Sequence, residues 1–150
     1  MENFFKNELI ELDLKSTERE GAIKELTSLL DKEGYVLSKE DFLQEVFDRE
    51  KLSDTAMGFG VAIPHGKSLS VKKSAIVFGR SKTGIEWGTS ENELVDSVFL
   101  IAVPEDKASD EHLKILAMLS RSLMDENFRK NLKESPSSEE VLKLFMNHTN

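Results

Sequence analysis

Residues 98–103 of this 150-residue chain read VFLIAV, an unbroken apolar run that stops at Pro104. A strand that is apolar at every position is typical of the centre of a sheet covered on both faces, because neither row of its side chains meets water. Residues 61–63 and 75–79 are short and apolar with β-branched members, and they predict further strands. Residues 85–87, which lie between two glycines, predict a short edge strand. The middle of the chain is therefore expected to form a sheet around residues 98–103.

The chain before this centre begins with a strand pattern and continues with two helix patterns. Residues 9–14 alternate apolar and acidic side chains, which indicates a half-exposed strand. Thr17 and Glu20 have the spacing of a capping box and predict the start of a helix. Ser38 is expected to cap a second helix, which places Arg49 near its C-terminal end, where the helix dipole favours a cation.

Helical periodicity returns after the central strand. Ser109 or Asp110 is expected to cap a long helix, and shorter helices are expected to start near Asp125 and Ser137. The expected apolar stripe of the long helix comprises Leu113, Leu116, Ala117, Ser120 and Leu123. Helices on both sides of a strand-rich centre predict a single α/β domain over residues 1–150, with a central mixed β-sheet flanked by helices on both sides.

Composition and charge exclude several classes of protein. The chain carries 28 acidic and 20 basic residues, a net charge of −8, so it is not expected to bind nucleic acid. It has no cysteine, which rules out disulfides and thiolate chemistry. The longest apolar run has six residues, so we expect neither a membrane span nor a signal peptide. A soluble, cytoplasmic protein that attracts a basic partner is the expectation.

The common cofactor and metal motifs are incomplete in this sequence. Residues 58–60 read Gly-Phe-Gly, but Ile63 occupies the next glycine position of the dinucleotide fingerprint, and no phosphate-binding loop sequence occurs. The three histidines are far apart, so no His-Glu-x-x-His pair exists. The sequence therefore predicts no cofactor and no metal, although two distant histidines could share a metal in the fold.

One segment has a pattern that points to chemistry. Residues 55–66 read TAMGFGVAIPHG, so an apolar strand runs directly into Pro64, His65 and Gly66. Ligand sites of open α/β sheets lie at strand ends, and a neutral imidazole is a competent nucleophile near pH 7. On the residues alone, a nucleophilic histidine and a histidine packed in a turn are both open interpretations.

Residues 48–66 resemble the active-site signature of the fructose/mannitol-type enzyme IIA domains of the bacterial phosphoenolpyruvate:sugar phosphotransferase system (PTS EIIA type 2). The resemblance continues through residues 85–88, 98–104 and 111–117 and covers nearly the whole chain. It implies a single EIIA domain with a mixed sheet flanked by helices. It also implies that His65 accepts phosphate from the carrier protein HPr and passes it to an enzyme IIB domain, without a cofactor.

The same resemblance assigns roles to other side chains. His112 is expected to donate a hydrogen bond to phosphate on His65, and Arg49 to bind that phosphate with its guanidinium. Without the resemblance, His112 would be a surface histidine at a helix start and Arg49 an ordinary cation at a helix end. Thr55 could bond to the imidazole, to the backbone, or simply cap a loop. His148, close to the C-terminus, is expected to lie in a frayed tail.

Several functions are compatible with this pattern. The first is a sugar phosphocarrier that meets a membrane IIC permease only indirectly, through enzyme IIB. The second is a nitrogen-regulatory EIIA protein, which keeps the histidine chemistry but delivers no phosphate to sugar. The third belongs to another class, a non-enzymatic module that binds a metal between His65 and His112 or regulates other proteins.

Overall fold

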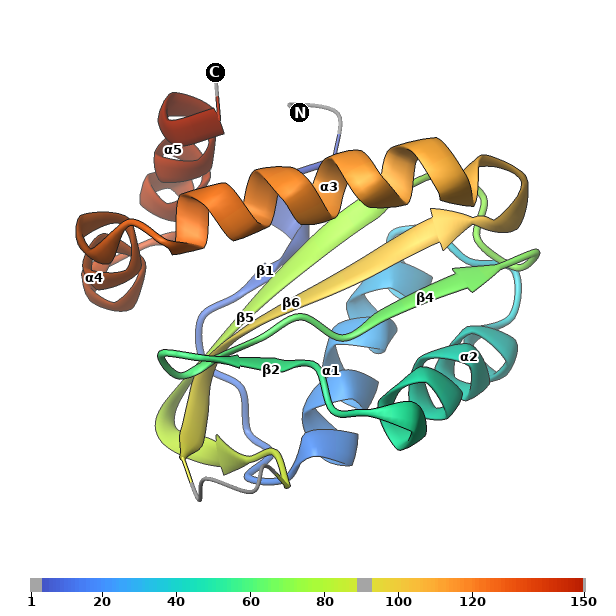
Figure 1. Ribbon diagram of the computed structural model, residues 1–150, viewed down its shortest axis with the longest axis horizontal. Helices are drawn as coiled ribbons and strands as arrows, with labels where there is room; N and C mark the ends of the chain where they lie inside the picture. Colours follow the sequence, from blue (N-terminus) through green and yellow to red (C-terminus); the bar gives the residue numbers. More distant parts are fainter. Residues whose placement is uncertain (1–3, 89–92, 150) are drawn as a thin grey trace.

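The computed structural model describes residues 4–88 and 93–149, which form a mixed sheet between two layers of helices (Figure 1). In chain order the 3₁₀ helices, α-helices and strands are η1 (Asn7–Leu9), β1 (Ile10–Glu11), α1 (Arg19–Lys32), α2 (Lys39–Leu52), β2 (Ala56–Gly58), β3 (Val61–Ala62), β4 (His65–Ser68), β5 (Ala75–Glu86), β6 (Leu94–Pro104), η2 (Glu105–Lys107), α3 (Ala108–Leu123), α4 (Glu126–Glu134) and α5 (Ser138–Thr149).

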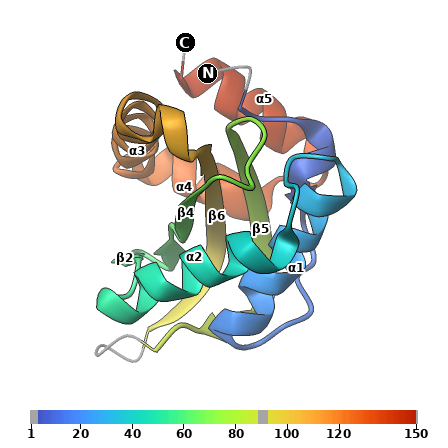
Figure 2. The same ribbon diagram turned by 90° about the vertical axis from the view of Figure 1, so that its right-hand side faces the viewer.

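The sheet has the order β1-β5-β6-β3-β2, and β4 also pairs with β6. Strand β6 is its centre, because it pairs antiparallel with β5 and parallel with both β3 and β4. Along residues 98–103, even-numbered side chains join a core with α1 and α2, and odd-numbered side chains join a core with α3, α4 and α5. Figure 2 shows the two helical layers on opposite sides of the sheet. The expected central strand and α/β fold class are confirmed.

Two strand predictions differ from the structure. Residues 85 and 86 are not a separate edge strand but the end of β5, which continues past an irregularity between Arg80 and Ile85 and still pairs with β6. The expected strand over residues 9–14 is reduced to Ile10–Glu11, because only these residues pair with β5. Two further strands, β2 and β4, carry no apolar alternation and were not expected.

The caps of the helices are partly as expected. Ser38 caps α2, since its hydroxyl accepts the N–H of Asp41 at 3.2 Å. The capping box at Thr17 is wrong: α1 begins after Glu18, and the Thr17 carbonyl instead accepts the N–H of Glu86 in β5 at 2.8 Å. The chain is thus held by the sheet at the point where the cap was expected.

Helix α3 begins at Ala108, so Ser109 and Asp110 lie inside its first turn and do not precede it. Its buried face comprises Ile115, Met118, Leu119, Ser122 and Leu123. Leu113 is predicted to face the core but is 67% exposed, because a different face of the helix packs against the sheet.

The C-terminal helix is fixed at its last turn. His148 Nδ1 lies 3.0 Å from Ser122 Oγ, and Nε2 lies 3.1 Å from Asp125 Oδ2. Its ring also packs on Phe128, with 4.4 Å between the ring centroids. The expected frayed tail is therefore wrong, because α5 contacts the turn between α3 and α4 through this histidine.

Candidate functional site

A cleft of about 410 Å³ with convergent polar groups lies where α2, β4 and α3 meet. In Figure 1, β4 runs between α2 on one side and α3 on the other. The residues that line the cleft are Glu45, Asp48, Arg49, Leu52, His65, Gly66, Lys67 and His112. The fold thus brings together the three site residues expected from the sequence, which come from three different elements.

His65 is the first residue of β4 and is only 9% exposed. It follows the Ile63-Pro64 break between β3 and β4, and Pro64 holds this break to the sheet by accepting the N–H of Ile101 at 3.0 Å. The Nδ1 atom of His65 lies 2.9 Å from the carbonyl oxygen of Ile63. Since a carbonyl can only accept, the ring proton lies on Nδ1 and the lone pair on Nε2. The nitrogen available for nucleophilic attack is therefore Nε2.

His112 is the fifth residue of α3, just past the first turn, and its ring faces His65 with 4.7 Å between the centroids. Burial, together with the positive charges of Lys67, Arg49 and, when it is protonated, His65, lowers the pKa of His112 to about 4; burial is the largest of these causes. Within the described part of the chain, its Nε2 is buried and has no hydrogen-bond partner. A neutral ring with an unused nitrogen at this place is suited to contact a ligand on His65.

The pKa of His65 is also lowered, mainly by burial and further by the nearby charges of Arg49 and Lys67. Two groups act in the opposite direction: the Ile63 carbonyl that accepts the ring N–H, and the carboxylate of Glu50. The net direction keeps His65 neutral at pH 7 and leaves its Nε2 lone pair free.

Arg49 reaches the cleft from the last turn of α2. One of its N–H groups donates to the carbonyl of Ser53 at 2.8 Å, which holds the chain just after the helix. A guanidinium has five N–H donors, so this bond leaves donors for an anion in the cleft. Asp48, the acidic residue next to Arg49 in α2, accepts a hydrogen bond from Gln44 at 2.8 Å. Arg49 therefore supplies positive charge beside the two histidines.

The structure adds Glu50, which the sequence interpretation did not assign to the site. Both the hydroxyl and the backbone N–H of Thr55 donate to its carboxylate, so Thr55 does not use its hydroxyl on the imidazole. A sequence signal for Glu50 exists: it continues the i, i+4 spacing of the buried residues Phe42 and Val46. A carboxylate on the buried face of a helix needs partners, which makes it a candidate for a structural or functional role.

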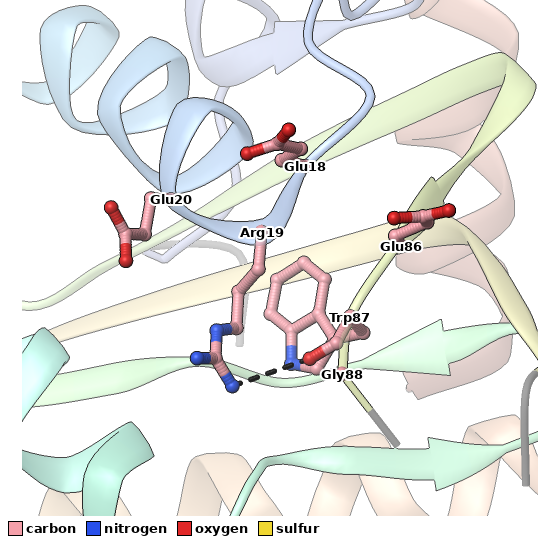
Figure 3. Close-up of a pocket in the computed structure, with 6 residues that line it drawn as sticks. All are labelled: Glu18, Arg19, Glu20, Glu86, Trp87 and Gly88. Atoms are coloured by element: carbon pink, nitrogen blue, oxygen red, sulfur yellow. Dashed lines mark hydrogen bonds between the residues drawn. The ribbon is translucent and has the colours of Figure 1, made fainter. Parts of the chain in front are cut away.

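A second hollow, of about 240 Å³, lies between the start of α1 and the end of β5 (Figure 3). Its lining residues are Glu18, Arg19, Glu20, Glu86, Trp87 and Gly88. Arg19 donates to the carbonyl of Trp87 at 3.2 Å, as the dashed line in Figure 3 shows. Three glutamates surround this single cation, so the hollow does not suit phosphate.

Two observations bear on the other function classes. Among the described residues, no three histidine, aspartate or glutamate side chains are gathered so that they could hold a metal ion. A metal shared by His65 and His112 would therefore lack a third protein ligand from this part of the chain. The described helices include none long and apolar enough to cross a membrane.

Comparisons with known proteins found similar sequences. The sequence model of the family "Phosphoenolpyruvate-dependent sugar phosphotransferase system, EIIA 2" matches residues 3–148. The fructose-specific EIIA component of Haloferax volcanii is 38% identical over 134 residues, which are 89% of this chain and 86% of that protein. The fructose-specific EIIABC component of Bacillus subtilis is 37% identical over 93% of this chain, but the chain spans only 22% of that protein.

Solved structures are similar over nearly the whole chain. The nitrogen regulatory protein IIA-Ntr from Neisseria meningitidis has a TM-score of 0.87 and 31% identity, covering 96% of this chain and 97% of that one. Enzyme IIAMTL, in its complex with phosphorylated enzyme IIBMTL from Escherichia coli, has a TM-score of 0.81 and 31% identity, covering 95% and 97%. The mixed sheet flanked by helices is thus a fold that this chain has in common with both.

Proposed function

Because this chain belongs to the EIIA type 2 family of the phosphoenolpyruvate-dependent sugar phosphotransferase system, we propose that it carries phosphate on His65 between HPr and an enzyme IIB domain. As an EIIA component it is a phosphotransferase. The proposed pathway ends in uptake and phosphorylation of a sugar of the fructose/mannitol class in the cytoplasm. The observation that carries the proposal is the Nδ1 bond of His65 to Ile63, which leaves Nε2 as a nucleophile in a cleft with two cations.

The proposed chemistry is an in-line displacement at phosphorus. As the bond from phosphorus to Nε2 of His65 forms, the bond from phosphorus to the phosphohistidine of HPr breaks, and the HPr imidazole leaves. The proton on Nδ1 stays in place and bonds more strongly to the Ile63 carbonyl as the ring gains positive charge. Arg49, Lys67 and a donor on His112 would face the phosphoryl oxygens, so the cleft offers a preorganised electrostatic environment.

The proposed partners follow from the relatives. The solved complex of enzyme IIAMTL with phosphorylated enzyme IIBMTL supports a IIB domain as the acceptor. The Bacillus subtilis relative contains A, B and C components in one protein, which supports an indirect association of this chain with a membrane IIC permease.

The similarity to the nitrogen regulatory protein of Neisseria meningitidis supports a second candidate function. A protein of that kind would use the same His65 chemistry to control other proteins and would not deliver phosphate to a sugar. The two candidates differ only in the acceptor, so they are separated by the step after phosphorylation.

Incubation with phosphoenolpyruvate, enzyme I and HPr, followed by intact mass measurement, tests the proposal. The chain should gain one acid-labile phosphoryl group, and His65→Ala should gain none. The same gain in His65→Ala would show that the phosphate lies elsewhere. Adding a fructose-class enzyme IIB domain to the phosphorylated chain should then remove the phosphate; phosphate that stays in place would favour the regulatory function.

A further inference from the structure

Glu50 is a charged side chain in an environment that nearly excludes water. It is 4% exposed and lies on the buried face of α2. One carboxylate oxygen accepts the hydroxyl of Thr55, and the other accepts the backbone N–H of Thr55 at 3.2 Å. A carboxylate so placed is stabilised by these two donors, and it fixes both the side chain and the backbone of Thr55.

The hydrogen bonds continue from Thr55 to the reactive histidine. The carbonyl of Thr55 accepts the N–H of Ile63 at 3.1 Å, beside the pairing of β2 with β3. The carbonyl of the same Ile63 accepts Nδ1–H of His65 at 2.9 Å. Hydrogen bonds therefore connect four residues in one path: Glu50, Thr55, Ile63 and His65. Each bond in the path fixes the position of the residue that forms the next bond.

The carboxylate of Glu50 also lies near a cation. A guanidinium nitrogen of Arg19 lies 3.9 Å from a Glu50 carboxylate oxygen, and the same nitrogen donates to the carbonyl of Trp87. Figure 3 shows the guanidinium of Arg19 directed toward that carbonyl, at the end of β5. Glu50 thus contacts the start of α1 through Arg19, and it contacts Thr55 in the segment between α2 and β2.

We propose that Glu50 is a positioning residue for phosphotransfer, which acts through Thr55 and Ile63 to hold His65 with its proton on Nδ1 and Nε2 free. This inference rests on the proposed function of His65. Glu50 does not line the cleft, so it has no direct contact with the phosphoryl group in this role. Its position explains why Thr55 bonds to a buried carboxylate and not to the imidazole.

The charge of Glu50 also acts on His65. A negative charge stabilises the imidazolium, so Glu50 raises the pKa of His65 against the lowering by burial. The other charged or titratable groups that face His65 are Arg49 from α2, Lys67 from β4 and His112 from α3. Removing only the charge of Glu50 should therefore lower the pKa of His65 further.

Glu50→Gln is the first test, because it keeps the shape of the side chain but replaces one acceptor oxygen with an NH₂ donor. The single-turnover rate of transfer from phospho-HPr, at saturating HPr, should fall by about tenfold to a hundredfold. The HPr concentration at half-saturation should stay the same, because Glu50 is buried away from the partner. Nitrogen NMR should show both ring tautomers of His65 and a lowered pKa, where the wild type shows the Nδ1–H tautomer alone.

Thr55→Val and Thr55→Ser test the hydrogen-bond path and leave the Glu50 carboxylate in place. If Glu50→Gln does not fold, these two variants still decide whether the path positions His65. Valine lacks the hydroxyl and should slow transfer and disturb the tautomer, whereas serine should restore both. Glu25→Gln is the matched control: Glu25 is a glutamate on α1 whose carboxylate accepts the backbone N–H groups of Lys15 and Ser16. It should leave both the rate and the tautomer unchanged.

The proposal would be overturned if both Glu50→Gln and Thr55→Val keep the wild-type transfer rate, the wild-type tautomer of His65 and the wild-type pKa of His65. An equal loss of rate in Glu25→Gln would also overturn it, since any loop-fixing glutamate would then have the same effect. A wild-type chain that takes no phosphate would contradict the proposed function instead. In that case the NMR comparison of wild type with Glu50→Gln still decides whether Glu50 positions His65.

Discussion

The rings of His65 and His112 lie 4.7 Å apart between centroids, beside Arg49 and Lys67, an arrangement in which a second ring proton, and with it a positive charge, is unfavourable on either histidine. Burial and the two cations lower the pKa of both histidines, so the cleft at pH 7 holds two neutral rings. A bound phosphoryl group brings about 1.5 to 2 negative charges. In the proposed phosphotransfer the same cations become favourable partners of the phosphoryl group, so the groups that keep His65 neutral would also stabilise its phosphorylated form.

The depressed pKa of His112 predicts a pH dependence of stability. Its pKa is about 4 in the folded chain and about 6.5 unfolded, so the unfolded chain binds the proton more readily between these values. The free energy of unfolding that depends on neutral His112 is complete above pH 6.5 and is lost as the pH falls toward 4. The loss should be on the order of 1 kcal/mol, because the ring is partly exposed.

Urea unfolding of wild type and His112→Gln at pH 7 and pH 5 measures this loss. The wild type should lose more stability than the variant, since glutamine has no proton to gain. Equal losses in the two chains would mean that His112 titrates normally in the folded state.

Arg49 is expected to contribute to transfer more than to folding. Arg49→Ala removes a cation from beside His65 and should slow transfer about tenfold or more, whereas the lost bond to Ser53 should cost only about 0.5–1.5 kcal/mol. Arg49→Lys keeps the positive charge but loses the planar guanidinium with its paired N–H donors. Its transfer rate should therefore lie between those of the wild type and Arg49→Ala. Transfer rates and thermal unfolding, measured on the same samples, separate the effects. A normal rate, or a large loss of stability, would assign Arg49 to structure.

Among the elements, α2 and β4 form one side of the cleft, and Gly66 sets the distance between them. A Cβ atom on Gly66 would lie 2.9 Å from Val46 Cγ2 and 3.1 Å from Phe42 Cε1, and both side chains are fully buried. Gly66→Ala should therefore push α2, which carries Arg49, away from His65. We expect a loss of about 1–3 kcal/mol in stability and slower phosphotransfer.

A double-mutant cycle with Val46→Ala identifies the cause. Removal of the Val46 methyl groups makes space for the new Cβ atom, so Gly66→Ala should cost less stability in the Val46→Ala background than in the wild type. Chemical unfolding of the four chains provides the comparison. If the losses of stability caused by Gly66→Ala and Val46→Ala are additive, the close contact between β4 and α2 is not the reason that residue 66 must be glycine.

The elements also show which part of the fold the sequence could predict. The strand at residues 98–103 was predictable because its side chains are buried on both faces of the sheet. The cap at Ser38 was predictable because it is a local interaction with Asp41. Strand β4 reads His-Gly-Lys-Ser, without an apolar pattern, and it exists because its backbone pairs with β6. Pairing with a distant strand is a tertiary effect that a local pattern cannot contain.

The site was predictable to a similar degree. His65 was visible as a histidine at a strand end, but the residues alone left its role open, and the family resemblance assigned His112 and Arg49. The path from Glu50 to His65 was not predictable, because two of its bonds use backbone carbonyls, whose positions depend on how the strands pair.

At the scale of the whole molecule, net charge and local charge differ. The chain has a net charge of −8, whereas the cleft is lined by two carboxylates, Glu45 and Asp48, and two cations, Arg49 and Lys67. Two leucines are largely exposed: Leu52, which lines the cleft, at 82%, and Leu113, which follows His112 in α3, at 67%. The distribution suits a basic partner that is attracted over a distance by the acidic molecule and held at the cleft by apolar contacts.

This distribution predicts a salt dependence of transfer from HPr, whose surface around its phosphohistidine is expected to be basic. Exposed charges are screened beyond about 8 Å at physiological ionic strength, so the second-order rate should fall about tenfold or more from low to high salt. The first-order rate at saturating HPr should change little, because it reports the chemical step in the cleft. Stopped-flow measurements over a series of salt concentrations give both rates.

Matched charge variants decide where the attraction originates. Glu45→Gln with Asp48→Asn removes two charges at the cleft and should flatten the salt dependence of the second-order rate. Glu126→Gln with Glu134→Gln removes the same charge from α4, at the other end of the molecule from α2 in Figure 1, and should change it less. If the two pairs have equal effects, net charge alone attracts the partner. If wild-type transfer is independent of salt, electrostatic attraction has no part in the encounter, and contacts such as those of Leu52 and Leu113 must account for it.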